Sequence, residues 1–303
     1  MTQISGQNPH SNPQQLLADH MNTAQTLRRQ QNWPEAERHF NAVLAIDPAN
    51  PLAATFAAQM KYRQQQEQDA IDGFAKVIQQ HPQFTLAHFL LGELHLANRR
   101  FKQAIPCLEK AINLGPAAAK MYLSLGQALK EIHYLNEAMR SLQQGLKLAT
   151  DHLELLQLLG EVSNELRNFE VSNQCFERLT KLNPNNAFTF SNMSLTLTSL
   201  KRIDDAWVAN KHAQRLLPNN PIIENNIATL LRYEDRIEES IAISRAALKL
   251  HPKHDGLTEA LGLALLSNGE LKEAFQCYDM RWQRPRLKAR ETTLGLIGSR
   301  WTG

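Results

Sequence analysis

Cysteine is scarce in this sequence of 303 residues, where only Cys107, Cys175 and Cys277 occur. They form no Cys-x-x-Cys pair and have no histidine at a metal-ligand spacing. The sequence therefore predicts neither a zinc site nor a redox motif, and no metal or cofactor is expected.

Long apolar runs and an excess of charge of one sign are also missing. The longest apolar stretch, around residues 257–266, is interrupted by Thr258, Glu259 and Gly262, which argues against a membrane-spanning helix. Residues 1–13 are polar and lack the apolar core of a secretory signal. Because 33 Lys and Arg face 30 Asp and Glu, neither nucleic acid nor a membrane is expected as a partner. These absences favour a cytoplasmic protein.

Glycine and proline are few, with 13 of each, yet their positions are periodic. The cysteines are separated by 175 − 107 = 68 and 277 − 175 = 102 residues, which are two and three times 34. Four glycines, each preceded by a leucine, also recur at multiples of 34 residues, and so do six prolines. The periodic residues are Gly92, Gly126, Gly160, Gly262, Pro48, Pro82, Pro116, Pro184, Pro218 and Pro252. A repeat of 34 residues follows.

This period resembles the tetratricopeptide repeat, whose pattern combines Leu-Gly, Ala-x3-Phe and a closing proline. The Ala-x3-Phe place is well matched in most units, while Ala206/Asn210 and Ser240/Ser244 are weaker copies. The better copies are Ala36/Phe40, Ala70/Phe74, Ala104/Leu108, Ala138/Leu142, Ser172/Phe176 and Ala274/Tyr278. The resemblance implies an all-α fold, a right-handed superhelical solenoid of about eight helix-turn-helix repeats with a concave groove.

The repeats divide the chain into three parts. Residues 1–16 are expected to be a disordered lead-in, and residues 289–303 a tail or a junction to a further domain. The solenoid is expected to cover residues 17–288, with units at about 17–50, 51–84, 85–118, 119–152, 153–186, 187–220, 221–254 and 255–288. Cysteines in different units would lie too far apart for a disulfide, so free thiols are predicted.

No Ser/His/Asp arrangement, Walker loop or glycine-rich dinucleotide turn is present, so the chain is not expected to be an enzyme by itself. The leading hypothesis is a protein-interaction scaffold that binds an extended partner segment in its groove. By the family resemblance, the first helix of each unit holds the ligand. The candidate partner-binding residues are Arg28, Arg29, Gln59, Arg63, Ser191, Asn192, Asn225, Asn226, Thr229 and Arg232.

Residues 187–192 also resemble a repeat of the protein O-linked N-acetylglucosamine transferases, whose superhelix carries a ladder of asparagines at the position of Asn192. Asn226 holds that position one unit after Asn192, and Asn22 holds it in the first unit. The second to fifth units have no asparagine there. A peptide-binding role and a merely solvated polar side chain are both open for these residues. Neither Asn192 nor Asn226 is expected to support the core.

The C-terminal residues suggest an alternative function. The run Tyr278-Asp279-Met280-Arg281-Trp282, followed by Ser299-Arg300-Trp301-Thr302-Gly303, resembles the junction in bacterial tetratricopeptide proteins that carry a glycosyltransferase-like domain. The alternative is therefore the acceptor-recognition portion of a protein glycosyltransferase whose catalytic domain lies beyond Gly303. A capping role for Tyr278 and Trp282 at the end of the repeats is the plainer interpretation.

Overall fold

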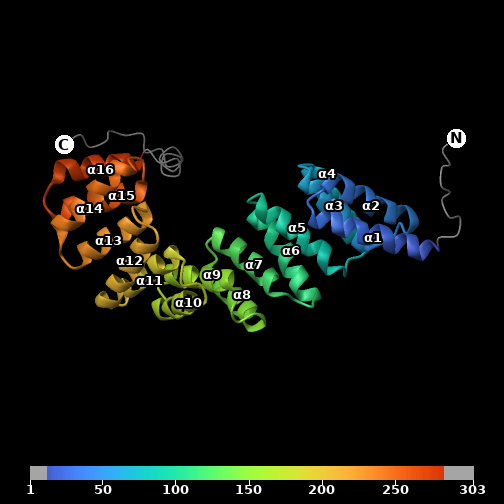
Figure 1. The fold of residues 1–303 in the computed structure, drawn as a ribbon, viewed down its shortest axis with the longest axis horizontal. Helices are drawn as coiled ribbons and strands as arrows, with labels where there is room; N and C mark the ends of the chain where they lie inside the picture. The colour runs from blue at the N-terminus through green and yellow to red at the C-terminus, as the bar shows by residue number, and fades with distance from the viewer. Residues whose placement is uncertain (1–11, 283–303) are drawn as a thin grey trace, which may run out of the picture. The chain divides into compact units, whose positions relative to one another are not determined.

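A computed structural model describes residues 12–282 of the chain, and within that range it contains sixteen α-helices and no strand (Figure 1). The predicted all-α repeat fold is confirmed. The helices are α1 (Pro13–Arg29), α2 (Trp33–Ile46), α3 (Pro51–Arg63), α4 (Glu67–Gln80), α5 (Thr85–Ala97), α6 (Phe101–Leu114), α7 (Ala119–Glu131), α8 (Leu135–Leu148), α9 (Leu153–Glu165), α10 (Phe169–Leu182), α11 (Ala187–Ser199), α12 (Ile203–Leu216), α13 (Pro221–Tyr233), α14 (Ile237–Leu250), α15 (Asp255–Ser267) and α16 (Leu271–Trp282).

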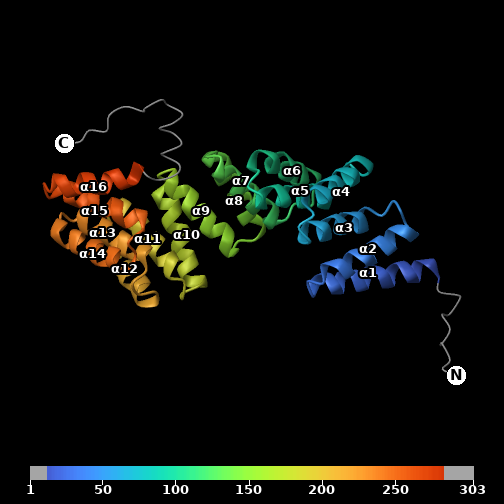
Figure 2. The same cartoon turned by 90° about the horizontal axis from the view of Figure 1, so that it is seen from above.

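The helices follow one another as pairs, in which a short turn reverses the chain and the second helix packs on the first (Figures 1 and 2). We call the odd-numbered helices the first helices and the even-numbered ones the second helices. Within the first and sixth repeats, for example, α1 packs on α2 and α11 packs on α12. Each pair therefore forms one helix-turn-helix repeat.

The turn inside each repeat has the same backbone form. A residue in the left-handed region follows every first helix, and the next residue donates its N–H to the carbonyl five residues earlier, as Gln66 does to Lys61 at 3.0 Å. This bond satisfies a carbonyl that the helix end leaves free, as in a Schellman motif. The left-handed residues are Gln31, Gln65, Arg99, His133, Arg167, Lys201, Asp235 and Gly269.

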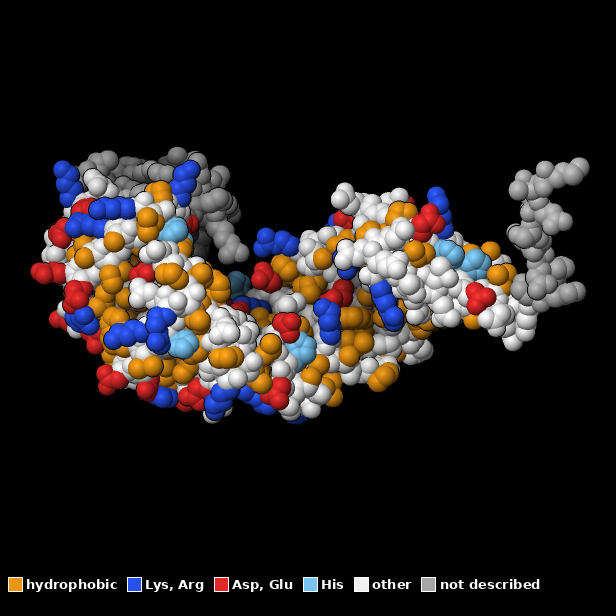
Figure 3. Space-filling view, in the orientation of Figure 1, with side chains coloured by type: hydrophobic (Ala, Val, Ile, Leu, Met, Phe, Trp, Pro, Cys, Tyr) orange, Lys and Arg blue, Asp and Glu red, His pale blue; other side chains and the backbone are white. Residues whose placement is uncertain are grey.

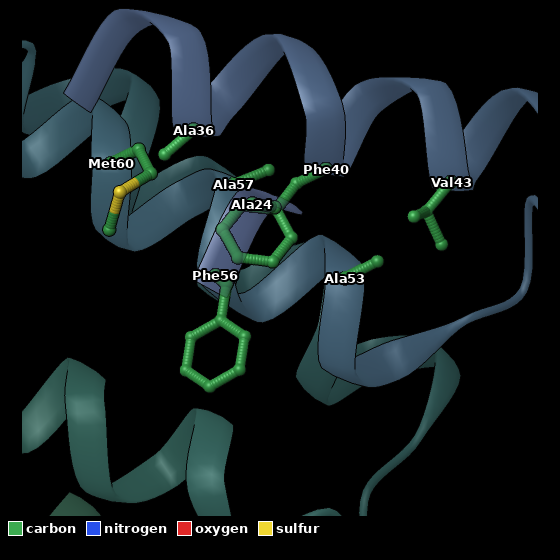
Figure 4. Close-up of a cluster of buried hydrophobic side chains, with 8 residues drawn as sticks. All are labelled: Ala24, Ala36, Phe40, Val43, Ala53, Phe56, Ala57 and Met60. Atoms are coloured by element: carbon green, nitrogen blue, oxygen red, sulfur yellow. The ribbon is translucent and has the colours of Figure 1, made fainter. Parts of the chain in front are cut away.

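The core of each repeat lies where the two helices cross. In the first two repeats it combines the rings of Phe40 and Phe56, whose centroids are 5.4 Å apart, with small alanines and Met60 (Figure 4). In the fifth repeat a Cβ on Gly160 would lie 2.8 Å from the Phe176 ring, so only glycine lets the helices come this close. Small residues on the first helix thus make room for large ones on the second.

The chain divides into two compact units, Met1–Leu155 and Leu156–Gly303, with the boundary inside α9. The first unit contains the helices from α1 to α8, and the second those from α10 to α16. Each unit is a stack of helix pairs with its own core clusters.

The N-terminal boundary differs from the sequence prediction. Helix α1 begins at Pro13, inside the segment 1–16 that was expected to be disordered, because the Asn12 side chain accepts the Gln14 N–H at 3.2 Å and proline suits the first helical position. Residues 1–11 and 283–303, which contain the predicted tail 289–303, lie outside the described range. None of the helices within residues 12–282 has the length and apolarity needed to cross a bilayer.

Candidate functional site

The first helices of neighbouring repeats pack on one another and so share one face of each compact unit. In the first unit α3 contacts α5 and α5 contacts α7, and in the second α11 contacts α13 and α13 contacts α15. All the predicted binding residues belong to first helices. Those in the first unit are Arg28, Arg29, Gln59 and Arg63, and those in the second unit are Ser191, Asn192, Asn225, Asn226, Thr229 and Arg232.

In the first unit Arg28 is tied to the neighbouring first helix. Its Nη1 donates to Oε1 of Gln59 at 3.2 Å, and its guanidinium lies 4.2 Å from the centre of the Phe56 ring. Burial lowers the pKa of Arg28, and the nearby charge of Arg29 lowers it further, although an arginine stays protonated at neutral pH. Arg28 therefore helps to hold α1 and α3 together, and a partner would have to replace these contacts.

The other arginines of this group are exposed. The guanidinium of Arg63 lies 5.8 Å from the centre of the Trp33 ring on α2, which leaves its N–H groups open to a ligand. The structure thus pairs Arg28 with Gln59 and holds Arg63 over a separate aromatic ring.

In the second unit, a stripe of side chains runs along α11. Phe188, Ser191, Asn192 and Leu195 follow the spacing i, i+3, i+4, i+7 and so lie on one side of the helix. Phe188 remains 43% exposed and Leu195 36% exposed, while Ser191 is fully buried between the helices. An amide thus lies between two apolar side chains on this surface.

Helix α13 carries a second stripe with the same order. Ile222, Asn225, Asn226, Thr229 and Tyr233 recur at helical spacing, and the apolar residues at the two ends are 44% and 51% exposed. The Thr229 hydroxyl donates to the Asn225 carbonyl at 2.9 Å within the same helix. We call the residues of these two stripes on α11 and α13 the amide face.

The two stripes are joined by a hydrogen bond between repeats. Nδ2 of Asn226 donates to the Ser191 hydroxyl at 2.8 Å and to the Ser191 carbonyl oxygen at 3.3 Å. Because the Ser191 side chain is fully buried, Asn226 satisfies a polar group that water cannot reach. The expectation that neither asparagine supports the core therefore needs revision for Asn226.

Asn192 and Arg232 differ from Asn226 in their contacts. Among residues 12–282, neither side chain takes part in a hydrogen bond or an ion pair, and both are half-buried. The side chain of Asn225 lies against Gly256 of α15, where a Cβ would meet its carboxamide at 3.6 Å. Among residues 12–282 the carboxamides of Asn192 and Asn225 thus take part in no hydrogen bond, and that of Asn225 lies beside α15.

Sequence reasoning missed Leu195 and Ile222 as members of this face. Both follow from the helical spacing once Phe188 and Asn226 are chosen, so the signal was present in the sequence. What the spacing does not report is exposure, which depends on the packing of neighbouring helices. On the surface seen in Figure 3, basic and acidic side chains are interspersed with apolar ones.

The cysteines are free thiols, as predicted. Burial raises the pKa of Cys175 to about 11, so this thiol is protonated and unreactive at neutral pH. Burial also raises the pKa of Cys107 and of Cys277. Within residues 12–282, no three His, Cys, Asp or Glu side chains are grouped so that they could hold a metal ion.

The predicted junction falls outside what the structure describes. Helix α16 ends at Trp282, but the side chains from Tyr278 onward and all residues after 282 are outside the described set. The capping role of Tyr278 and Trp282 and the glycosyltransferase alternative therefore stay predictions.

A family model of the tetratricopeptide repeat matches residues 21–84, 89–130 and 225–280, and a second model of the same description matches residues 119–152. No curated protein sequence matches the chain significantly.

Several solved structures share the fold. YrrB, described as a tetratricopeptide repeat protein with an unusual peptide-binding site, is 17% identical over 61% of this chain and 95% of its own, with a TM-score of 0.57. PilF of Pseudomonas aeruginosa is 14% identical over 72% of this chain and 100% of its own, with a TM-score of 0.63. A tetratricopeptide repeat protein from Parabacteroides merdae is 12% identical over 83% and 99%, with a TM-score of 0.53. Because the family model matches more than half of the chain, the chain belongs to the tetratricopeptide repeat family.

Proposed function

We propose that this protein is an interaction scaffold and that its amide face on α11 and α13 binds an extended segment of a protein partner. The observation that carries this proposal is the repeated order of apolar, amide and apolar side chains on two adjacent first helices. The apolar ends stay 36% to 51% exposed although a packed core lies directly beneath them. Exposed apolar side chains in a row are typical of interaction surfaces.

An extended peptide suits this arrangement for two reasons. Its main chain has unpaired N–H and C=O groups, and the free carboxamide of Asn192 offers both an acceptor and a donor to one peptide unit. Its apolar side chains can pack on Phe188 and Ile222 and remove them from water. Hydrogen bonds to the peptide main chain would form with any peptide sequence. The apolar contacts would favour peptides that have apolar side chains at matching positions.

Family membership supports the proposal at the level of the fold. Tetratricopeptide repeat proteins bind protein partners, and YrrB is described as having a peptide-binding site, although that site belongs to YrrB. The exposed arginines Arg29 and Arg63 of the first unit are a second place for partner contacts. Location in the cytoplasm stays an expectation.

The test is selection of ligands from a random dodecapeptide library with the full chain, followed by titration of labelled peptides. We expect the selected peptides to contain apolar residues and to bind Asn192→Ala about 5- to 150-fold more weakly, since two hydrogen bonds are lost. Phe188→Ala should weaken binding by about tenfold through lost apolar contact. Gln174→Ala, at an exposed position on α10, is the matched control and should bind like the parent.

If the selected peptides bind the parent, Asn192→Ala and Phe188→Ala equally well, the amide face is not the binding site. The arginines of the first unit then become the next candidates. Melting curves of each variant show whether a lost affinity comes from lost folding.

A further inference from the structure

A different surface of the first unit carries a cavity that the amide face does not explain. The cysteine position of the second helix is held by His39, Gly73, Cys107 and Ser141 in the first four repeats, and a matching position on the first helix is held by His20, Ala54, His88 and Tyr122. His20 and His39 meet there in the first repeat, with their Nδ1 atoms 2.9 Å apart. In the fourth repeat the Ser141 hydroxyl donates to the Tyr122 carbonyl at 3.0 Å.

In the second repeat these two positions hold the two smallest residues, Ala54 and Gly73. A cavity of about 330 Å³ lies beside them, between α2, α3 and α4. Its lining includes Leu44, Ala54, Ala58, Lys61, Gly73 and Lys76.

The cavity cannot close by moving the helices together. A Cβ on Gly73 would lie 2.8 Å from the Cβ of Ala58, so α3 and α4 already touch at this point. In the third and fourth repeats glycine stands on the first helix instead, at Gly92 and Gly126, and the second helix carries the larger residue. The two helices are thus in close contact in each of these repeats, whichever of them carries the glycine.

Two lysines set the charge of this cavity. Lys61 and Lys76 both line it, and neither forms an ion pair or a side-chain hydrogen bond with another residue of the range 12–282. A cavity at the equivalent place between α6, α7 and α8 differs, because its Arg140 is paired with Glu137 at 3.2 Å. Of these two cavities, the one in the second repeat therefore joins an apolar floor to unpaired positive charge.

We propose that the cavity of the second repeat is a second protein-binding site, which takes an acidic segment of a partner protein. An apolar side chain of the segment fills the space above Ala54 and Gly73, and an adjacent carboxylate lies between Lys61 and Lys76. A volume of about 330 Å³ is large enough to hold one large side chain of a partner. The site lies on the second-helix side of the unit and is independent of the amide face.

The experiment uses the full chain and an array of decapeptides, each with one Asp or Glu next to Leu, Ile, Phe or Met. Every peptide has a copy in which Asn or Gln replaces the acid. We expect saturable binding of a subset of the acidic peptides, and about 10- to 100-fold weaker binding of their amide copies, since a charge-assisted contact is lost. Higher salt should weaken the acidic peptides selectively.

The variants test the cavity itself. Ala54→Tyr adds a large side chain to the lining of the cavity and should weaken binding by changing the fit of the apolar side chain. Lys61→Gln with Lys76→Gln should weaken the acidic peptides to the level of their amide copies. Lys102→Gln, an exposed lysine on α6, is the control and should have no effect. Asn192→Ala should also leave this binding unchanged, which separates this proposal from the amide face.

The proposal is overturned if no acidic peptide binds saturably, or if amide copies bind as well as the acids. It is also overturned if Ala54→Tyr binds like the parent while melting normally. If Ala54→Tyr misfolds, the lysine variants decide, because their substitutions lie at the edge of the cavity and leave its floor intact.

Discussion

The second helices of the first two repeats and those of the sixth and seventh repeats bury different residues at the same place. Phe40 and Phe74 fill the helix crossing in the first unit and are 0% and 1% exposed. In the sixth and seventh repeats the same place holds Asn210 and Ser244, which are both fully buried. Neither polar atom of Asn210 has a hydrogen-bond partner, nor has the hydroxyl of Ser244.

This difference indicates which part of the chain has the lowest local stability. A buried polar group without a partner costs about 1–3 kcal/mol relative to one that is paired. Helix α11 adds further buried hydroxyls at Thr189, Ser194 and Thr198, and that of Ser194 is also without a partner. Because the amide face lies on this helix, we expect the proposed partner site to be on the part of the chain that opens most easily.

The largest effect should come from truncating the aromatic core. Phe40→Ala should lower the free energy of local unfolding in the first repeats by about 3–5 kcal/mol, because it removes a fully buried ring and leaves a cavity. The matched truncation Ser244→Ala should cost almost nothing, since it removes a hydroxyl that has no partner. Hydrogen exchange resolved by helix measures both. Equal losses for the two variants would remove the contrast between the regions.

The next effect should be a gain. Asn210→Leu places in the sixth repeat the residue that Leu108 and Leu142 provide in the third and fourth. It replaces an unsatisfied amide by an apolar side chain, so the free energy of unfolding should rise by about 1–3 kcal/mol. Asn136→Leu, at an exposed position of α8, should give no gain. This gain should be measurable as slower amide hydrogen exchange in α11 and α12. Unchanged exchange would contradict the prediction.

A smaller loss should separate the two asparagines of the amide face. Asn226→Ala leaves the buried Ser191 hydroxyl without its donor and should cost about 1–2 kcal/mol in chemical denaturation. Asn192→Ala breaks no hydrogen bond within the described chain and should leave stability unchanged. If both variants melt like the parent, the bond between the repeats is unimportant for folding.

Much of the fold could be predicted from the sequence because it repeats. Residues such as Gly160 and Phe176 recur at a 34-residue step, and their contact at the helix crossing follows from their sizes alone. The polar core was also visible, since Asn210 and Ser244 stood out as weak copies of the Ala-x3-Phe place.

The candidate sites were less predictable because they depend on contacts between helices. Helical spacing placed Ser191 and Asn226 on one face, but their hydrogen bond depends on the distance between two repeats. The cavity beside Ala54 and Gly73 was missed for the same reason, since each residue alone is an ordinary small residue. The opening is formed by residues of three helices together.

The smallest effect concerns the turns, which are alike in both units and should therefore not contribute to the contrast. Gln65 and Lys201 have φ angles of 65° and 60°, a region that is unfavourable for residues with a Cβ. Gln65→Gly and Lys201→Gly should each stabilise their repeat by at most about 1 kcal/mol, because the relief of backbone strain is offset by greater freedom of the unfolded chain. Gly269→Ala, at the same turn with φ 80°, is the reverse change and should cost a similar amount. Chemical denaturation of the variants, with exchange of α3 and α11, measures these shifts. Since the same bond closes both turns, a clearly larger gain at Lys201 than at Gln65 would mean that the turns, and not only the buried residues of the second helices, weaken the second unit.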